Sequence, residues 1–132
     1  MHVAVDLDDV TVDFINGMLH SYELEFGERF TYPSGTWGSE MVAFFKTGTP
    51  ALNAAGYKTG WAWLKEREWL WALFPAVPGA IAGIATLRAQ GHYVEAVTSK
   101  PEWAEHNVWK WLGKWRPAFQ RVTITKFGER KV

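Results

Sequence analysis

The sequence begins with a short apolar run that ends abruptly in carboxylates. The run Val3–Val5 is typical of a buried β-strand, and Asp6, Asp8 and Asp9 follow it directly. Like charges at this spacing repel one another, and a bound divalent cation such as Mg²⁺ would remove that cost. Ligands of an open α/β sheet bind at the carboxyl ends of the strands, where this cluster falls. A solvated acidic turn after the strand is the structural alternative.

Length and composition narrow the classes of protein. The chain of 132 residues is long enough for one domain, or for a small core with an inserted segment. Its formal net charge is zero, which disfavours a nucleic acid or an anionic membrane held by bulk charge. Without cysteine it has neither disulfides nor thiolate chemistry. With no export signal and no membrane-length apolar run, we expect a cytoplasmic protein.

The hydrophobic pattern predicts an α/β fold. Strands are expected at 2–6, 93–98 and 122–125, and helices at 12–26, 39–46, 61–73, 80–90 and 101–115. The alternation of strands and helices in the second half predicts a parallel sheet with right-handed crossovers, a Rossmann-like core. The core is assigned to residues 1–14 and 76–132. Residues 15–75 are expected to form a small helical, Trp-rich cap inserted after the first strand.

The spacing of the acids predicts a division of roles. Asp6 and Asp8 are two residues apart at a strand end, and paired carboxylates suit covalent catalysis, in which one attacks and the other moves protons. Asp9 and Asp13 are instead expected to act at the start of the following helix, where the macrodipole favours acids.

A second candidate site follows the second apolar strand. Thr98 and Ser99 offer two hydroxyls at a strand-to-helix junction, and phosphate oxygens bind hydroxyls and helix N-terminal amides together. The structural alternative is an ordinary helix N-cap at Ser99. A lysine after the third strand, Lys126 or Lys131, could neutralise a phosphoryl group, and the alternative for each is a solvated surface lysine.

Aromatic residues are unusually frequent, with nine tryptophans in the chain. Most of those in the first half are expected to form the core of the insertion, because Trp and Phe dominate burial energetics. One or two could stack on a nucleobase. The set comprises Phe14, Trp37, Phe44, Phe45, Trp61, Trp63, Trp69 and Trp71.

These motifs together resemble a known family. The run from Asp6 to Val10 resembles the Asp-x-Asp-x-Thr/Val signature of haloacid dehalogenase (HAD)-type phosphatases. More closely, residues 6–14 are similar to the opening of the 5′(3′)-deoxyribonucleotidases, Asp-Met-Asp-Gly-Val-Leu-Ala-Asp-Phe. Residues 75–80 resemble that family's Pro-Leu-Pro-Gly-Ala junction, residues 98–99 its Thr-Ser motif, and residues 36–40 its lid piece Phe-Trp-Val-Ser-Glu.

The resemblance implies a Mg²⁺-dependent phosphomonoesterase that dephosphorylates deoxyribonucleoside monophosphates, with a small-molecule nucleotide as partner. Asp6 would be the nucleophile that forms an aspartyl-phosphate. Asp8 would protonate the leaving oxygen and later activate water. The Asp6 carboxylate and the Asp8 backbone carbonyl would bind the metal ion.

The resemblance also assigns the substrate contacts. Thr98, Ser99 and a lysine would hold the phosphoryl oxygens, and the family pattern places Lys131 better than Lys126 for this role. Phe14 and Trp37 match family positions that face the base.

Two departures from the family pattern matter. Asp9 stands where the family has glycine, and the sequence ends at Val132, before the family's strand ending in Ile-Asp-Asp. The resemblance therefore implies that the C-terminal part of the core is missing, which leaves the first strand on an unpaired edge. Either the chain is truncated, and its activity needs completion beyond residue 132, or a partner fills the gap, which leaves a homodimer open. Two alternatives remain, a HAD phosphatase with another phosphorylated substrate and a truncated, non-catalytic binding protein.

Overall fold

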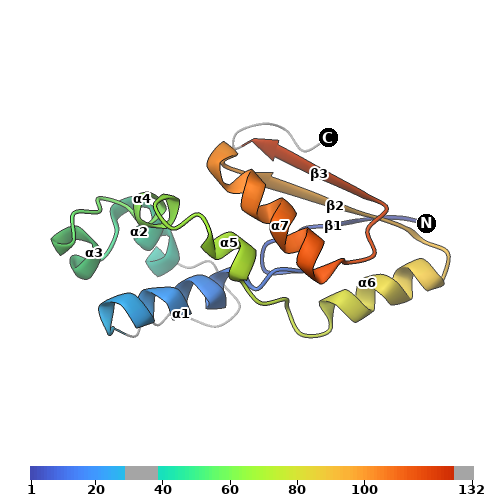
Figure 1. Cartoon of the computed structure of the whole chain (residues 1–132), viewed down its shortest axis with the longest axis horizontal. Coiled ribbons are helices and arrows are strands. Elements are labelled where there is room, and N and C mark those ends of the chain that lie inside the picture. The colour runs from blue at the N-terminus through green and yellow to red at the C-terminus, as the bar shows by residue number, and fades with distance from the viewer. Residues whose placement is uncertain (29–38, 127–132) are drawn as a thin grey trace. The chain divides into compact units, whose positions relative to one another are not determined.

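The computed structural model describes residues 1–28 and 39–126. Their elements in chain order are β1 (His2–Val5), α1 (Phe14–Phe26), α2 (Ser39–Thr47), α3 (Pro50–Ala54), α4 (Gly60–Lys65), α5 (Leu70–Leu73), α6 (Ala80–Ala89), β2 (Tyr93–Lys100), the 3₁₀ turn η1 (Glu102–Ala104), α7 (Glu105–Trp115) and β3 (Arg121–Lys126) (Figure 1). Among these described residues, no helix is both long and apolar enough to cross a bilayer.

The chain divides into two compact units. The first unit is built from Met1–Gly17 and Trp69–Val132, and the second is the continuous segment Met18–Glu68. Residues 69–75, which the sequence pattern assigned to the insertion, lie in the first unit because α5 packs against α7 there. The role of the second unit as a cap stays a prediction.

The first unit contains a three-stranded parallel sheet with the order β1-β2-β3, which confirms the parallel sheet expected from the sequence. Val3 pairs with Val94 and Thr98 pairs with Ile124, so the carboxyl ends of all three strands lie at one edge of the sheet. Within the described residues, β1 pairs with β2 only.

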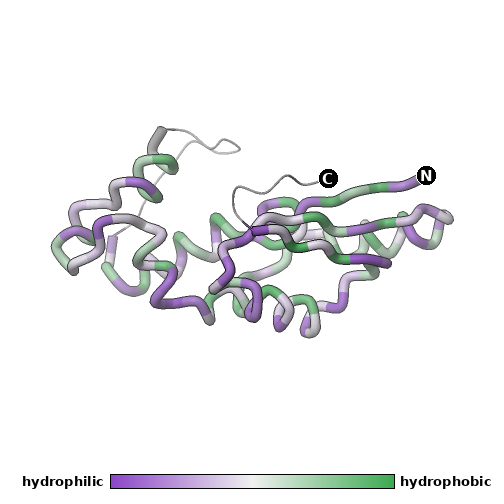
Figure 2. The backbone as a smooth tube through the Cα atoms, turned by 90° about the horizontal axis from the view of Figure 1, so that it is seen from above, coloured by the Kyte–Doolittle hydropathy of each residue, from purple (hydrophilic) through white to green (hydrophobic). Residues whose placement is uncertain are grey.

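The two faces of β2 differ in burial. Val94, Ala96, Thr98 and Lys100 are buried, whereas the alternating residues between them are exposed or half-buried. Successive strand residues point to opposite faces, so the four buried side chains share one face, and α6 packs against β2. Figure 2 shows that both hydrophobic and hydrophilic residues occur along the strands.

The structure corrects the predicted end of β2. The strand continues to Lys100 instead of ending at residue 98, and Ser99 is a strand residue rather than the N-cap of a helix. The first α-helical residue is Glu105, after the turn η1, and no side chain caps that helix. As consecutive strand residues, Thr98 and Ser99 point to opposite faces of the sheet.

The predicted helix at 61–73 is two helices, α4 and α5, with a turn between them. Trp63 is buried in the second unit and Trp71 in the first, so the helix is interrupted near the place where the chain passes from one unit to the other. The helix α3 was not foreseen, although Thr49 caps it and Pro50 opens it, a common start signal.

Aromatic side chains form the core of the second unit, as expected. The Trp63 ring contacts the rings of Tyr22 and Phe44 edge-on, at centroid distances of 6.0 and 6.4 Å. The Tyr22 hydroxyl and the Thr49 hydroxyl share a buried hydrogen bond of 2.7 Å. Gly60 lies against Phe44 so closely that a Cβ there would approach the Phe44 carbonyl oxygen to 2.6 Å.

Candidate functional site

A tight loop follows β1 and is anchored by a buried leucine. Leu7 is fully buried, and its carbonyl accepts hydrogen bonds from the backbone N–H groups of Thr11 (2.9 Å) and Val12 (2.7 Å). The Thr11 hydroxyl donates to the Asp6 carbonyl at 3.1 Å. The leucine therefore fixes the backbone on which the flanking residues Asp6 and Asp8 are mounted.

Two of the four acids in this region serve the start of α1, as the sequence predicted. The Asp9 carboxylate accepts the backbone N–H of Ile15 at 3.0 Å, and the Asp13 carboxylate accepts that of Asn16 at 3.4 Å. Both carboxylates thereby satisfy amides in the first turn of the helix, where the macrodipole also favours negative charge.

The backbone explains the residue type at position 9. Asp9 has φ of 60°, a left-handed conformation that glycine adopts freely and that aspartate tolerates better than most residues. The turn thus requires a positive φ at position 9, a conformation that glycine would also adopt. Burial raises the pKa of Asp9, and the Ile15 N–H lowers it; the carboxylates of Asp8 and Asp13 raise it further, and the Lys100 ammonium lowers it.

Asp8 forms an ion pair with Lys100 that joins the ends of β1 and β2. The Lys100 Nζ donates to the Asp8 Oδ2, and the lysine side chain is only 2% exposed while that of Asp8 is 29% exposed. The ammonium also lies 4.7 Å from the centroid of the buried Trp71 ring. A buried ammonium is stable in a fold when a carboxylate and an aromatic face compensate its charge, as both do here.

Asp6 presents a carboxylate at the end of β1. The residue is exposed, and its Oδ1 accepts the backbone N–H of Leu7 at 2.8 Å. Because β1 and β2 are parallel neighbours, Asp6 lies at the same edge of the sheet as Thr98 and Lys100. The end of one strand therefore supplies carboxylates, and the end of the next supplies a hydroxyl and an ammonium.

The predicted phosphate ligands are placed differently from one another. Thr98 is fully buried, and within the described residues its Oγ1 has no hydrogen-bond partner. The Ser99 hydroxyl, on the other face, donates to the Lys126 carbonyl at 3.3 Å. The Lys126 side chain is 64% exposed, with its Nζ 4.0 Å from Glu102. Lys131 lies outside the described residues, and all these phosphate roles stay predictions.

The predicted base contacts also stay predictions. Phe14 is 2% exposed, and its ring stacks on Trp71 with a centroid distance of 4.8 Å and meets Phe74 edge-on at 5.5 Å. Phe14 is thus part of the aromatic core of the first unit. Trp37 lies outside the described residues.

The residues present fit a magnesium ion only in part. No group of three or more histidine, aspartate or glutamate side chains is arranged for a metal within the described residues. Mg²⁺, however, is commonly held by one or two carboxylates together with substrate phosphate and water. The exposed carboxylate of Asp6 suits that arrangement, whereas the Asp8 carboxylate is already bound by Lys100.

Lys100 is the residue that the sequence pattern missed. It follows the Thr-Ser pair directly, and the expected strand end at 98 placed it in a loop. A signal was present, since Lys100 lies two residues after Thr98 and shares its face if the strand continues. The available hint was that the alternating pattern of the strand could be extended as far as Lys100.

Comparisons with known proteins concern the fold. No protein-family model and no curated protein sequence matches the chain. A crystal structure of YfnB from Bacillus subtilis, described as a HAD-hydrolase bound to magnesium, is similar with a TM-score of 0.58 at 18% identity. The match covers 93% of this chain and 64% of YfnB, so the chain spans less than two thirds of that relative's length.

A second similar structure is described as a β-phosphoglucomutase from Thermotoga maritima. It has a TM-score of 0.46 and 15% identity, over 93% of this chain and 60% of the other. From the first match and the parallel sheet, the chain has the Rossmann-like α/β fold of HAD-type hydrolases, with a helical segment inserted after the first strand.

Proposed function

We propose that the chain provides the catalytic core of a phosphomonoesterase that acts through an aspartyl-phosphate. The observation that carries the proposal is the ion pair between Asp8 and Lys100, which joins the acidic end of β1 to the Thr98–Lys100 end of β2. The HAD-type fold supports the same reaction class. In the proposed reaction, Asp6 at this sheet edge is the nucleophile and Asp8 is the proton carrier, and the neighbouring strand end offers donors for a phosphoryl group.

Each acid has a defined part in the proposed reaction. The exposed carboxylate of Asp6 attacks phosphorus, the ester P–O bond breaks, and an aspartyl-phosphate forms. Asp8 delivers a proton to the leaving oxygen. In the second step Asp8 takes a proton from water, the water oxygen attacks phosphorus, and inorganic phosphate leaves Asp6 as a free carboxylate.

A magnesium ion belongs to the proposal, with Asp6 as its main protein ligand and Asp8 close by. When bound, the ion would offset the negative charge of the phosphoryl oxygens beside the carboxylates. The chain's own part is to hold Asp6 in place through the Leu7 N–H and to hold Asp8 through Lys100.

The proposed substrates are deoxyribonucleoside monophosphates. The support for this finer statement is the likeness of residues 6–14 and of the other motifs to the 5′(3′)-deoxyribonucleotidases. A sugar phosphate is the competing substrate class for the same chemistry. Equal turnover of nucleotides and simple sugar phosphates would remove any base-stacking role of Phe14 and Trp37.

The test measures phosphate release from a panel of nucleotides and sugar phosphates in the presence of magnesium. Asp6→Asn removes the nucleophile with almost no change in shape, and we expect it to lower turnover by a factor of about 10³ or more. Glu23→Gln, the same change at an exposed acid of α1, is the matched control and should leave turnover unchanged. Full activity in Asp6→Asn would rule out the aspartyl-phosphate.

A further inference from the structure

We propose that the first unit binds single-stranded nucleic acid at the edge of its sheet opposite the acidic loop. This binding goes beyond the phosphomonoesterase function and does not depend on it. The surface, named here the basic edge, consists of four exposed cations and two exposed aromatic rings: Arg88, Lys114, Arg116, Arg121, Tyr93 and Trp115.

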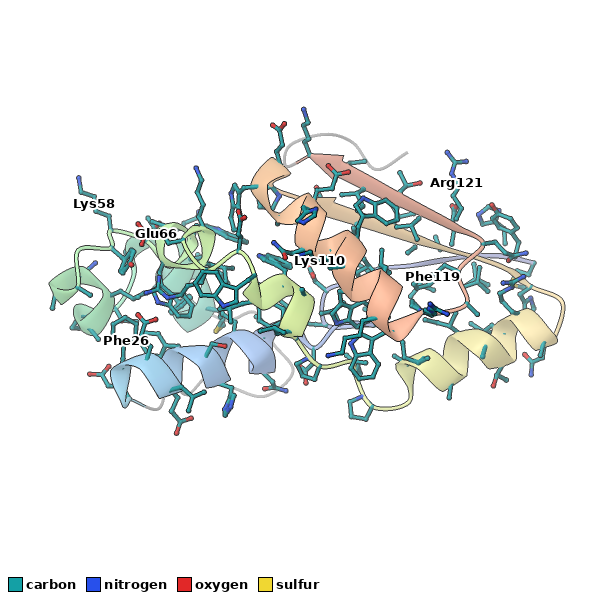
Figure 3. The ribbon with its side chains drawn as sticks, in the orientation of Figure 1. Phe26, Lys58, Glu66, Lys110, Phe119 and Arg121 are labelled. Carbon is teal, nitrogen blue, oxygen red and sulfur yellow. The ribbon has the colours of Figure 1, made fainter. Side chains whose placement is uncertain are left out.

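The topology of the first unit brings the basic edge together. Because the sheet is parallel, the amino ends of its strands share one edge, and β2 begins there at Tyr93 and β3 at Arg121. The helices α6 and α7 each precede a strand by a short loop, so both end at this same edge. Figure 3 shows Phe119 and Arg121 toward the end of the sheet where α6 ends, and Lys110 farther from it on α7.

Hydrogen bonds fix the loops that form the basic edge. Arg88 donates from Nη1 to the Ala118 carbonyl at 3.3 Å, which links the end of α6 to the loop before β3. The Gln120 N–H donates to the Val94 carbonyl at 2.8 Å, and the Val94 N–H donates to Gln120 Oε1 at 2.7 Å. The cations are therefore mounted on connected backbone, which lowers the ordering cost of binding a ligand.

The charges of the first unit are separated between its two edges. The acids of the loop after β1, and Glu102 and Glu105 before and at the start of α7, lie toward the carboxyl edge. At the basic edge the acid of the described part of the chain is Glu95, whose carboxylate lies 2.9 Å from His2 Nε2. Within that part, no carboxylate forms an ion pair with any of the four cations. A net charge of zero thus includes a local positive surface that attracts a polyanion.

The backbone at Arg116 is a second observation in favour of this surface. The residue ends α7 with φ of 47°, a left-handed conformation in which glycine is the usual residue. Its side chain is exposed, and its Nε donates to the Gly113 carbonyl at 3.4 Å. Lys114 already places a cation in the last turn of α7, where it offsets the helix dipole. A strained arginine at an exposed position therefore indicates a use for its guanidinium.

The exposed rings favour nucleic acid over an acidic peptide. Tyr93 and Trp115 are each 37% exposed. Trp115 lies against the buried ring of Trp111 with centroids 5.9 Å apart, and the Trp111 indole donates to the Phe74 carbonyl at 2.7 Å, so Trp115 rests on a fixed support. Unpaired bases stack on aromatic rings while arginine and lysine bind the phosphates, whereas an acidic peptide supplies only the charges.

An anionic membrane fits this surface less well. A helix that binds a membrane surface inserts its apolar face between the lipids. The apolar face of α7 is buried within the fold, through Val108, Trp111 and Leu112. The exposed part of α7 therefore offers cations and the Trp115 ring, but not an apolar face to insert.

The test is a titration of a fluorescently labelled oligodeoxythymidylate with the 132-residue protein, followed by fluorescence anisotropy at several salt concentrations. Four cations that each contact one phosphate give a slope of about −3 for the logarithm of affinity against that of salt, because each contact to a single strand contributes about −0.7. Affinity should then fall about 50-fold between about 50 and about 200 mM salt. We expect a dissociation constant on the order of 10⁻⁵ M at the lower salt.

Arg116→Gly separates binding from a structural role, since it removes the guanidinium and also the backbone strain. It should weaken binding about 5- to 10-fold, make the salt slope shallower by about 0.7, and leave the melting temperature unchanged or raised. Arg121→Gln should cause the same loss of affinity. Lys110→Gln removes an exposed lysine from the middle of α7 and is the matched control, with affinity expected within about 2-fold of the original.

The aromatic part of the surface has its own test. Trp115→Leu should weaken binding about 5-fold or more while leaving the salt slope unchanged, because stacking releases no counterions. If Trp115→Leu does not fold, Tyr93→Leu takes its place with the same expectation. A variant of either kind that binds as the original chain does would remove the stacking role and overturn the proposal.

Four further outcomes would overturn the proposal. The original chain shows no binding at the lowest salt, or Arg116→Gly binds as tightly as the original. Lys110→Gln lowers affinity as much as Arg116→Gly, which would show diffuse attraction without a defined surface. Lastly, polyglutamate or vesicles of anionic lipid bind the protein as tightly as the oligonucleotide does at the same salt.

Discussion

The two units differ in how their buried and half-buried charged side chains are paired. In the second unit, Arg67 donates from Nε and Nη2 to the two carboxylate oxygens of Glu25, at 2.5 and 2.8 Å, and the Trp63 indole donates to the same carboxylate at 3.1 Å. The Arg67 guanidinium also lies 5.2 Å from the centroids of the Tyr57 and Trp63 rings. The Arg67 cation is therefore compensated both by the Glu25 carboxylate and by two aromatic faces.

In the first unit, the loop after β1 carries several acids, and within the described residues the ammonium of Lys100 contacts one of them. Asp9 and Asp13 are used at the start of α1, and Asp8 is paired with Lys100. Asp6 keeps an exposed carboxylate beside them. Several ionisable groups held together in a fixed loop are typical of a site for a ligand, which makes this loop the candidate. The comparison therefore supports placing the proposed site in the first unit.

The largest expected effect on stability comes from separating the ion pair of the first unit. Asp8→Ala removes the carboxylate beside the buried ammonium of Lys100, and we expect it to lower the free energy of unfolding by about 3 kcal/mol. Urea denaturation measures this loss. The double variant Asp8→Asn/Lys100→Met should recover much of it, and a single variant as stable as the original chain would contradict a buried, coupled pair.

A smaller effect is expected from the network of the second unit. Arg67→Met removes the paired hydrogen bonds to Glu25 and the contacts with two rings. Because Glu25 remains 34% exposed, the loss should be about 1 kcal/mol. Phosphate affinity should not change. A drop in phosphate affinity without a drop in stability would erase the contrast between the two units.

The smallest effect is a gain at Asp9. Its raised pKa means that the neutral acid stabilises the fold below its ordinary pKa of 3.8 and that this contribution is lost as the pH rises, so the ionised carboxylate is a cost at neutral pH. Asp9→Asn keeps an acceptor for the Ile15 N–H and tolerates the left-handed backbone. Because Asp9 is exposed and water screens its charge, we expect a gain of at most about 0.5 kcal/mol at neutral pH, measured by thermal unfolding. Asp9→Gly, which loses the acceptor, should not show the gain.

Much of the fold follows from local pattern. Short stretches of sequence contain the apolar runs of β1, β2 and β3 and the glycines that end α1 and α6. The order of elements and the parallel sheet were therefore predictable. The interruption of the predicted helix at 61–73 was not predictable, because its two halves pack in different units. Trp63 packs in one and Trp71 in the other, and no local periodicity carries that information.

The candidate site was predictable where it depends on motif and not where it depends on strand length. The Asp6–Asp8 spacing marked the acidic end of β1, and the helix-start roles of Asp9 and Asp13 followed from their positions. Lys100 was missed because two more residues of pairing with β3, Ser99 with Thr125 and Lys100 with Lys126, decide where β2 ends. Such pairing depends on a partner strand far along the chain.

The division of the chain also has a consequence for its biogenesis. The second unit is one uninterrupted stretch, whereas β1 finds its hydrogen-bonding neighbour only when Val94 has been synthesised to meet Val3. Contacts between residues so distant in sequence form slowly. Until they form, the unpaired strand can associate with other chains. The inserted helices can therefore mature on the ribosome while the amino-terminal strand is still unpartnered, and the acidic loop takes its final shape only after the whole insertion has emerged.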